Sequence, residues 1–164
     1  MRFEKISYEQ WYMYLAANTC FTEEEIRETY DNIQLPKAGS EYAAGHDFYS
    51  PVTVRIGTEG SFLIPTGIRW ITEEEDKNKC LIMAPRSGLG TKYGMRLTNT
   101  IGIIDADYYC AANEGHIMAS VTAERELQIN AGDRFMQGII VPYYRCGGES
   151  NEKRTGGFGS TGVK

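Results

Sequence analysis

The C-terminal tail combines one aromatic ring with glycines and hydroxyl groups, a set suited to bind a phosphorylated ligand that carries a ring. It reads GGFGSTG over residues 156–162 and follows the basic pair Lys153-Arg154. Phe158 can stack on a base, Arg154 can bind a phosphate, and glycine lets backbone amides approach a ligand closely. Because this tail has no apolar set to bury, we expect a flexible arm that becomes ordered over a bound ligand.

Two carboxylates follow a short apolar run at residues 102–104. Asp105 and Asp107 are two positions apart, so in a strand both side chains would point to the same face. Carboxylates placed together in this way are capable of acid–base chemistry. The alternative is that the pair caps a hairpin turn.

Other polar or glycine-rich clusters interrupt the chain at residues 43–50 (AAGHDFYS), 84–90 (APRSGLG), 99–108 (NTIGIIDADY) and 132–137 (GDRFMQ). Taken singly, each cluster is more typical of an ordinary turn or a local cap than of a functional site.

Length and charge limit the class of protein. A chain of 164 residues is long enough for one domain with a real core, and a net charge of −5 argues against a general nucleic-acid or membrane-surface binder. The four cysteines lack CxxC spacing, which argues against zinc and favours reduced thiols. With no signal peptide and no apolar run that could span a membrane, we expect a cytoplasmic protein.

Two short helices are expected near the N-terminus. Ser7 and Thr22 each begin a capping-box pattern, and the apolar residues that follow the first cap recur on one helical face: Tyr8, Trp11, Tyr12 and Leu15. In the second helix Ile26 and Tyr30 lie one turn apart, and both helices need a surface to pack against.

From about residue 33 the pattern changes to short β-rich runs punctuated by Gly, Pro, Asn and Asp, which predicts an all-β fold, a jelly-roll-like β-barrel. The runs are 52–56, 61–64, 67–71, 79–84, 95–98, 102–104, 116–121, 126–129 and 134–141. We therefore expect an N-terminal helical extension over 1–32, a barrel over 33–146 and a flexible C-terminal arm over 147–164.

Together and in this order, the polar clusters resemble the five sequence motifs of the homotrimeric dUTP pyrophosphatase (dUTPase) family. The resemblance spans about residues 33–162, and three segments stand as the family writes them: 85–88 (PRSG), 102–108 (GIIDADY) and 157–162 (GFGSTG). It implies an enzyme that hydrolyses dUTP to dUMP and pyrophosphate by in-line attack of water on the α-phosphorus. Such an enzyme keeps uracil out of DNA and supplies dUMP for dTMP synthesis.

The resemblance also implies roles for individual residues on the nucleoside side. Asp105 would be the general base and would meet the sugar 3′-hydroxyl, and the ring of Tyr108 would pack on the deoxyribose and exclude a 2′-hydroxyl. The uracil pocket would be formed by Asn99 and by backbone groups of the neighbouring hairpin, at Ile103, Ile104 and Met118.

On the phosphate side, Gln137 would help place the attacking water, and Asp47 would support the site. The phosphates would be held by Arg86, Ser87 and Gly88, with Ser87 near the α,β-bridging oxygen where charge develops. The arm would close over the nucleotide through Arg154, Phe158, Gly159 and Ser160. Mg²⁺ would bind mainly to the substrate phosphates and water, and a homotrimer would share its active sites between chains.

The chain departs from the family pattern in three places. The loop after Tyr108 is longer than usual before Gly115, Lys153 occupies the usual arginine position of the arm, and the N-terminal helices are additional. Two alternatives remain open at this point. One is a dCTP deaminase of the same superfamily, and the other is a non-catalytic nucleotide-binding regulator on the same fold.

Overall fold

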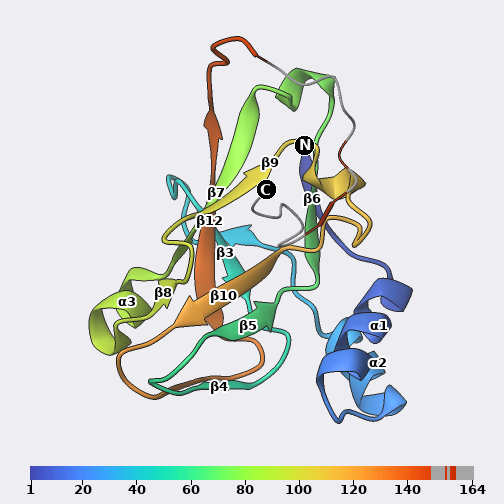
Figure 1. Ribbon diagram of the computed structural model, residues 1–164, viewed down its shortest axis with the longest axis vertical. Helices are drawn as coiled ribbons and strands as arrows, with labels where there is room; N and C mark the ends of the chain where they lie inside the picture. Colours follow the sequence, from blue (N-terminus) through green and yellow to red (C-terminus); the bar gives the residue numbers. More distant parts are fainter. Residues whose placement is uncertain (149–153, 155, 158–164) are drawn as a thin grey trace.

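Antiparallel strands make up most of the body of the protein, and a pair of helices lies at one side of it (Figure 1). The computed structural model describes residues 1–148, 154 and 156–157. Of the residues singled out in the sequence, Lys153, Phe158, Gly159 and Ser160 therefore lie outside the described residues.

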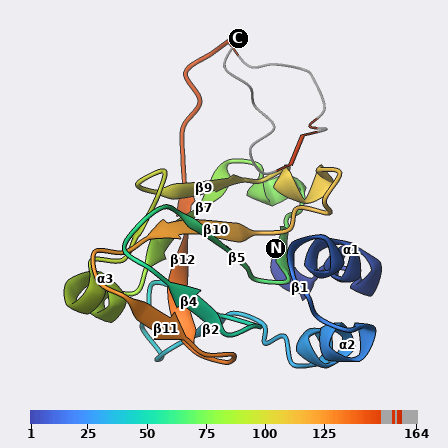
Figure 2. The ribbon, with the colours of Figure 1, turned by 60° about the horizontal axis from the view of Figure 1, so that its bottom comes forward.

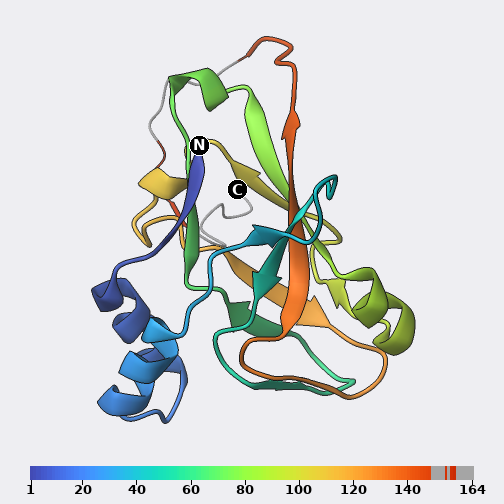
Figure 3. The same ribbon diagram turned by 180° about the vertical axis from the view of Figure 1, so that it is seen from behind.

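The largest sheet is organised around β12, which is hydrogen-bonded to β3 on one side and to β7 on the other. Figure 3 shows β12 as the long strand that runs through this sheet. In sheet order the strands are β2 (Lys37–Ala38), β3 (His46–Tyr49), β12 (Arg134–Pro142), β7 (Lys79–Pro85) and β9 (Gly102–Asp105).

Smaller sheets complete the β body, and their buried side chains join those of the large sheet in one core. Their pairs are β1 (Arg2–Lys5) with β6 (Ile68–Ile71), β11 (Leu127–Ile129) with β4 (Val54–Ile56), and β10 (Met118–Thr122) between β5 (Phe62–Pro65) and β8 (Arg96–Leu97). All of the predicted β runs form strands, and the all-β prediction is confirmed.

Some elements do not follow from the sequence pattern. Residues 2–5 belong to the expected N-terminal helical extension but form the strand β1, in which Phe3 contacts the rings of His46 and Phe48. The glycine-rich segment after Arg86 forms the helix α3 (Ser87–Tyr93) instead of a simple turn. Two 3-10 turns, η1 (Glu74–Asp76) and η2 (Tyr108–Cys110), flank the loops described below.

The two predicted helices are present and begin after the predicted N-cap residues, but the predicted capping box forms only at Thr22, because the Ser7 N–H bonds to Glu114 instead of Gln10. Ser7 caps α1 (Tyr8–Asn18), and Thr22 forms a capping box with Glu25 at the start of α2 (Glu23–Asp31). The helices lie side by side against the β body (Figure 2). Trp11 and Leu15 are fully buried as expected, whereas Tyr12 on the same predicted face is partly exposed. None of the helices in the described residues is long and apolar enough to cross a membrane.

His116 joins the helical pair to the β body. Its ring is buried against the edges of Trp11 and Tyr14, and its Nε2 accepts a hydrogen bond of 3.0 Å from the backbone N–H of Gly67. Burial removes the charged imidazolium from water and lowers the pKa of His116 to about 4, although nearby Glu114 partly opposes this shift. His116 is therefore neutral in the folded protein at pH 7.

The buried His116 predicts a defined loss of stability in mild acid. In the unfolded chain the imidazole titrates near pH 6.5, so below that pH the unfolded state gains a proton that the folded state does not bind. The free energy of unfolding should be unaffected above pH 6.5 and should fall by about 3 kcal/mol as the pH decreases to about 4.

Urea unfolding at pH 7, 6 and 5 checks this prediction, with His116→Gln as the comparison because glutamine keeps an acceptor and does not titrate. The carboxylates with lowered pKa, Glu4, Asp76 and Glu114, lose their contribution mainly below about pH 4.5, which is below the lowest pH of this series. If the free energy of unfolding decreased equally with pH in the wild type and in His116→Gln, the prediction would be contradicted.

Candidate active site

The first cluster of candidate residues surrounds Asp47 on β3. Its Oδ2 forms an ion pair of 2.5 Å with Arg86 Nη1 and another of 3.1 Å with Arg134 Nη1. Asp47 is buried, and a buried carboxylate needs such partners. The carboxylate thereby fixes two guanidinium groups at the end of β7, where they can bind an anion.

Gln137 belongs to the same cluster because of the strand register. It lies opposite Asp47 on β3 and opposite Ala84 on β7. A Cβ added at Gly45, two residues before Asp47, would lie only 3.3 Å from Gln137 Oε1. This tight contact favours glycine at position 45. Ser87 and Gly88 open α3 directly after Arg86, and a Cβ added at Gly88 would meet no heavy atom within 4 Å.

Arg134 was not singled out by the sequence analysis. The register of β12 shifts between Arg134 and Met136, an irregularity of the β-bulge kind, and such bulges re-aim side chains. The contact with Asp47 depends on this shift and on a pairing between positions 87 residues apart. Only the presence of Arg134 inside the GDRFMQ cluster signals its role.

The second cluster gathers around Arg154. Its Nε donates a hydrogen bond of 2.8 Å to Asp107 Oδ1, and its Nη2 pairs with Asp105 Oδ2. The guanidinium carbon is 5.7 Å from the centre of the Tyr108 ring. Burial opposes the charge of Arg154, yet the hydrogen bond to Asp107 and the nearby charge of Asp105 raise the pKa of its guanidinium. Both carboxylates thus meet at one guanidinium, although the strand-alternation argument does not apply, because β9 ends at Asp105 and Asp107 lies in the turn that follows.

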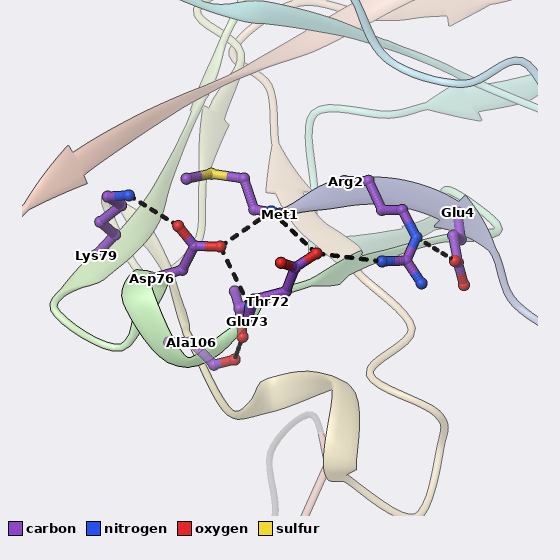
Figure 4. Close-up of polar contacts among 8 residues, drawn as sticks. All are labelled: Met1, Arg2, Glu4, Thr72, Glu73, Asp76, Lys79 and Ala106. Atoms are coloured by element: carbon purple, nitrogen blue, oxygen red, sulfur yellow. Dashed lines mark hydrogen bonds and ion pairs between the residues drawn. The ribbon is translucent and has the colours of Figure 1, made fainter.

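A hydrogen bond from a neighbouring strand holds the turn between the two carboxylates. Thr72 follows β6, and its hydroxyl donates a hydrogen bond of 2.5 Å to the carbonyl of Ala106 (Figure 4). The adjacent η1 turn is fixed by Asp76, which binds Lys79 at 2.8 Å and the Met1 amine at 3.0 Å. These partners, Lys79 first, lower the pKa of Asp76 to about 2, so the carboxylate stays charged at pH 7.

The residues expected to form the base pocket lie on different sheets. Ile103 and Ile104 belong to β9, with Ile103 exposed, and Asn99 lies exposed in the turn that precedes them. Met118 begins β10, which pairs with β5 and β8 in another sheet. Tyr108 is buried, and its hydroxyl lies 3.4 Å from the carbonyl of His116. The contribution of Met118 to the pocket stays a prediction.

An open cleft lies beside the second cluster. Its volume is about 560 Å³, and its lining includes both carboxylates, Arg154 and two further cations, Lys77 and Arg145. The cleft therefore brings acids and bases together in a space large enough for a small charged ligand. Within residues 1–148, 154 and 156–157, no three His, Cys, Asp or Glu side chains form a group that could hold a metal ion.

The two clusters lie at opposite ends of β7. Asp105 is paired with Cys80 near the start of this strand, whereas Arg86 follows its last residue. Arg86 lies six positions after Cys80 along the extended strand, which corresponds to about 20 Å. Figure 1 shows the arrowhead of β9 pointing away from α3. One chain therefore holds Asp105 and Arg86 too far apart to act on the same phosphate.

Comparisons with known proteins place the chain among nucleotide hydrolases. A family model described as dUTPase matches residues 31–162. The deoxyuridine 5′-triphosphate nucleotidohydrolase of Lactococcus lactis is 37% identical over 147 residues, which cover 85% of this chain and 96% of the relative. The crystal structure of a dUTPase from Streptococcus mutans is 30% identical, covers 90% of this chain and 100% of its own, and gives a TM-score of 0.66.

A more distant solved structure shares the fold. It is a mutant dUTPase from phage phi11 of S. aureus, with 20% identity, a TM-score of 0.61 and coverage of 75% of this chain and 92% of its own, and it is described with a structural Mg(II) ion. These likenesses confirm the predicted jelly-roll-like β-barrel.

Replacement of Thr72 by valine tests how the turn between the carboxylates is held. Thr72→Val keeps the side-chain shape but leaves the carbonyl of buried Ala106 without this partner, so the free energy of unfolding should fall by about 1–3 kcal/mol. Urea unfolding measures the change, and hydrogen exchange should show faster exchange at residues 105–109.

Thr98→Val is the matched control, because the hydroxyl of Thr98 makes only a long, exposed contact of 3.4 Å with the carbonyl of Ser120. It should change stability by less than about 0.5 kcal/mol. Equal effects of the two substitutions would show that the Thr72 hydrogen bond does not stabilise this turn.

Proposed function

This chain belongs to the dUTPase family and hydrolyses dUTP, and we propose that it does so at sites that combine the two residue clusters from different chains. The observation that carries the proposal is the separation along β7, about 20 Å between Asp105 and Arg86 in one chain. A second copy of the chain can bring its own end of β7 to the first. The proposed assembly is a homotrimer with shared active sites.

In the proposed reaction, water attacks the α-phosphorus of dUTP in line with the departing pyrophosphate, and dUMP is the second product. Asp105 orients this water and accepts its proton. Gln137 of the other cluster helps to place the water, and Ser87 stabilises the charge that develops on the α,β-bridging oxygen. Arg86 binds the phosphates, and Asp47 keeps its guanidinium in position.

Arg154 links substrate binding to the general base. Its Nη2 forms an ion pair with Asp105 Oδ2, the carboxylate oxygen that would otherwise be available to water. A triphosphate carries more negative charge than one carboxylate and competes for this guanidinium. We propose that the phosphates draw Arg154 away when dUTP binds, which returns this oxygen of Asp105 to the attacking water. The arm residues Phe158, Gly159 and Ser160 would then cover the uracil and the phosphates.

Selectivity for deoxyuridine is proposed to come from a tight sugar and base pocket. The Tyr108 ring would pack against the deoxyribose and leave no room for a 2′-hydroxyl. Asn99 would hydrogen-bond the uracil edge, and the pocket would be completed by backbone groups at Ile103, Ile104 and Met118. The resulting dUMP is a substrate for dTMP synthesis, and removal of dUTP keeps uracil out of DNA.

We propose Mg²⁺ as the cofactor, bound mainly through the substrate's phosphate oxygens and water. Arg86 and Arg134, fixed by Asp47, can bind part of the phosphate charge, and an ion held by the phosphates would need no dedicated protein ligands. When bound, the ion would neutralise and orient the triphosphate. We further propose that the protein acts in the cytoplasm and binds neither nucleic acid nor membranes. The proposed domain organisation is an N-terminal extension over 1–32, a β-barrel over 33–146 and a C-terminal arm over 147–164.

A pyrophosphate-release assay across dUTP, UTP, dTTP and dCTP tests the proposed substrate selectivity. Rapid release from dUTP and little from the other three is expected, because each competitor adds a hydroxyl or a methyl group or changes the base edge. Ammonia release from dCTP would instead indicate a deaminase, and tight binding of dUTP without turnover in Mg²⁺ would indicate a non-catalytic regulator.

Asp105→Asn should separate binding from chemistry. Asparagine keeps the shape of the side chain but cannot accept the proton of the attacking water, so kcat should fall by about 10²–10⁴. The Kd for a non-hydrolysable dUTP analogue should change less than about threefold, as isothermal titration calorimetry would show. Asp31→Asn is the control, since this exposed carboxylate lies at the end of α2 and belongs to neither cluster. Unchanged turnover in Asp105→Asn would remove this residue from the mechanism.

A further inference from the structure

The long loop between Tyr108 and β10 is fastened to the first helix. Glu114 in this loop accepts two hydrogen bonds from Ser7, one of 2.8 Å from the backbone N–H to Oε2 and one of 2.5 Å from the hydroxyl to Oε1. Ser7 is the N-cap residue of α1, and its side chain also accepts a bond of 3.1 Å from the N–H of Gln10. A residue 107 positions away thus completes the cap of this helix.

The second helix shows what the usual local arrangement looks like. At its cap, Glu25 accepts from the Thr22 N–H at 2.7 Å and from the Thr22 hydroxyl at 3.0 Å. In a capping box this acceptor lies three residues after the cap. At Ser7 the same two bonds go to Glu114 instead. The carboxylate that completes the cap therefore comes from the loop in the first helix and from the helix itself in the second.

The backbone of the loop needs a fixed partner at this position. Glu114 has φ of 57° and Gly115 has φ of 71°, so two successive residues are left-handed, which a non-glycine residue rarely adopts. A Cβ at Gly115 would lie 2.5 Å from the Cα of Tyr109, so the turn is also tightly packed. Besides Ser7, Arg69 approaches the Glu114 carboxylate at 3.7 Å. These contacts hold the loop in a single strained conformation.

Asn113 connects the fixed loop to Tyr108, the tyrosine that is proposed to bind the sugar. Its Oδ1 accepts a bond of 3.2 Å from the Gly115 N–H, and its Nδ2 lies 3.5 Å from the Tyr108 hydroxyl. On its other side, a Cβ at Gly157 would lie 2.8 Å from Asn113 Oδ1, so the arm passes over the same side chain. Asn113 is thus in contact with the tyrosine and with the arm.

We propose that the Ser7–Glu114 pair is a positioning device for the nucleoside site: it fixes the loop that places Asn113 against Tyr108 and thereby sharpens discrimination between 2′-deoxyribose and ribose. Glu114 and Ser7 act through Asn113 and Tyr108 and do not touch the substrate. The N-terminal helices are then a working part of the enzyme. This inference rests on the proposed role of Tyr108.

Glu114→Ala tests the inference, with kcat/KM measured for dUTP and for UTP. Loss of the carboxylate releases the loop, and the ratio of the two kcat/KM values should fall by at least about tenfold, mainly through better use of UTP. A merely structural role would lower the fraction of active enzyme, which lowers kcat for both substrates equally and leaves their ratio and both KM values unchanged. Glu114→Gln, which keeps an acceptor and a donor, should restore most of the ratio.

Glu25→Ala is the matched control, because it removes the same two hydrogen bonds from the cap of the other helix. It should leave the ratio unchanged. If Glu114→Ala does not fold, Ser7→Ala compared with Thr22→Ala makes the same test, with an expected shift of about threefold for Ser7→Ala alone.

The outcomes separate the inference from the proposed function. A wild-type enzyme that discriminates strongly, together with an unchanged ratio in Glu114→Ala or in Ser7→Ala, would overturn the inference alone. A wild-type enzyme that uses UTP as well as dUTP would remove the proposed role of Tyr108 and this inference with it. A lowered ratio in the loop variant and an unchanged one in Glu25→Ala would support the positioning role.

Discussion

The pairing of β7 with both of its neighbours is the constraint on which the rest of the site depends. Through β12 and β3 it places Asp47, Gln137 and Arg86 at one end of the strand, and through β9 it places Asp105 at the other. A strand cannot shorten, so Arg86 and Asp105 of one chain, the groups proposed to bind phosphate and to accept a proton, stay about 20 Å apart along β7. Assembly with further copies would bring such halves together, and activity would then depend on oligomer formation.

The second cluster is held together by ion pairs and by a hydrogen bond from a neighbouring segment. Arg154 satisfies both carboxylates, and Thr72 fixes the carbonyl between them. Behind this cluster, Glu114 connects the loop after Tyr108 to the cap of α1, and His116 packs below the same helix. The N-terminal helices thus lie behind the nucleoside pocket and support it.

Local patterns in the sequence predicted both helices and the strands from β4 onward, because alternation and capping residues act over a few positions. They missed β1 and β2. They did not predict β3, because burial of Asp47 depends on two arginines that are distant in the sequence. Motif order correctly indicated the enzyme family, but the roles of Arg134 and Glu114 depend on a β-bulge and on a contact across 107 positions. Apart from the position of Arg134 inside the GDRFMQ cluster, the sequence contains no signal for either contact.

A mixing experiment tests the shared site most directly. Asp105→Asn and Arg86→Ala each disable one cluster, so each variant alone should be inactive on dUTP. If sites combine clusters from different chains, trimers refolded from an equal mixture should contain some sites with both clusters intact, and about a quarter of wild-type turnover should return. If both clusters of every site came from one chain, the mixture would stay as inactive as its components, and that result would contradict a site shared between chains.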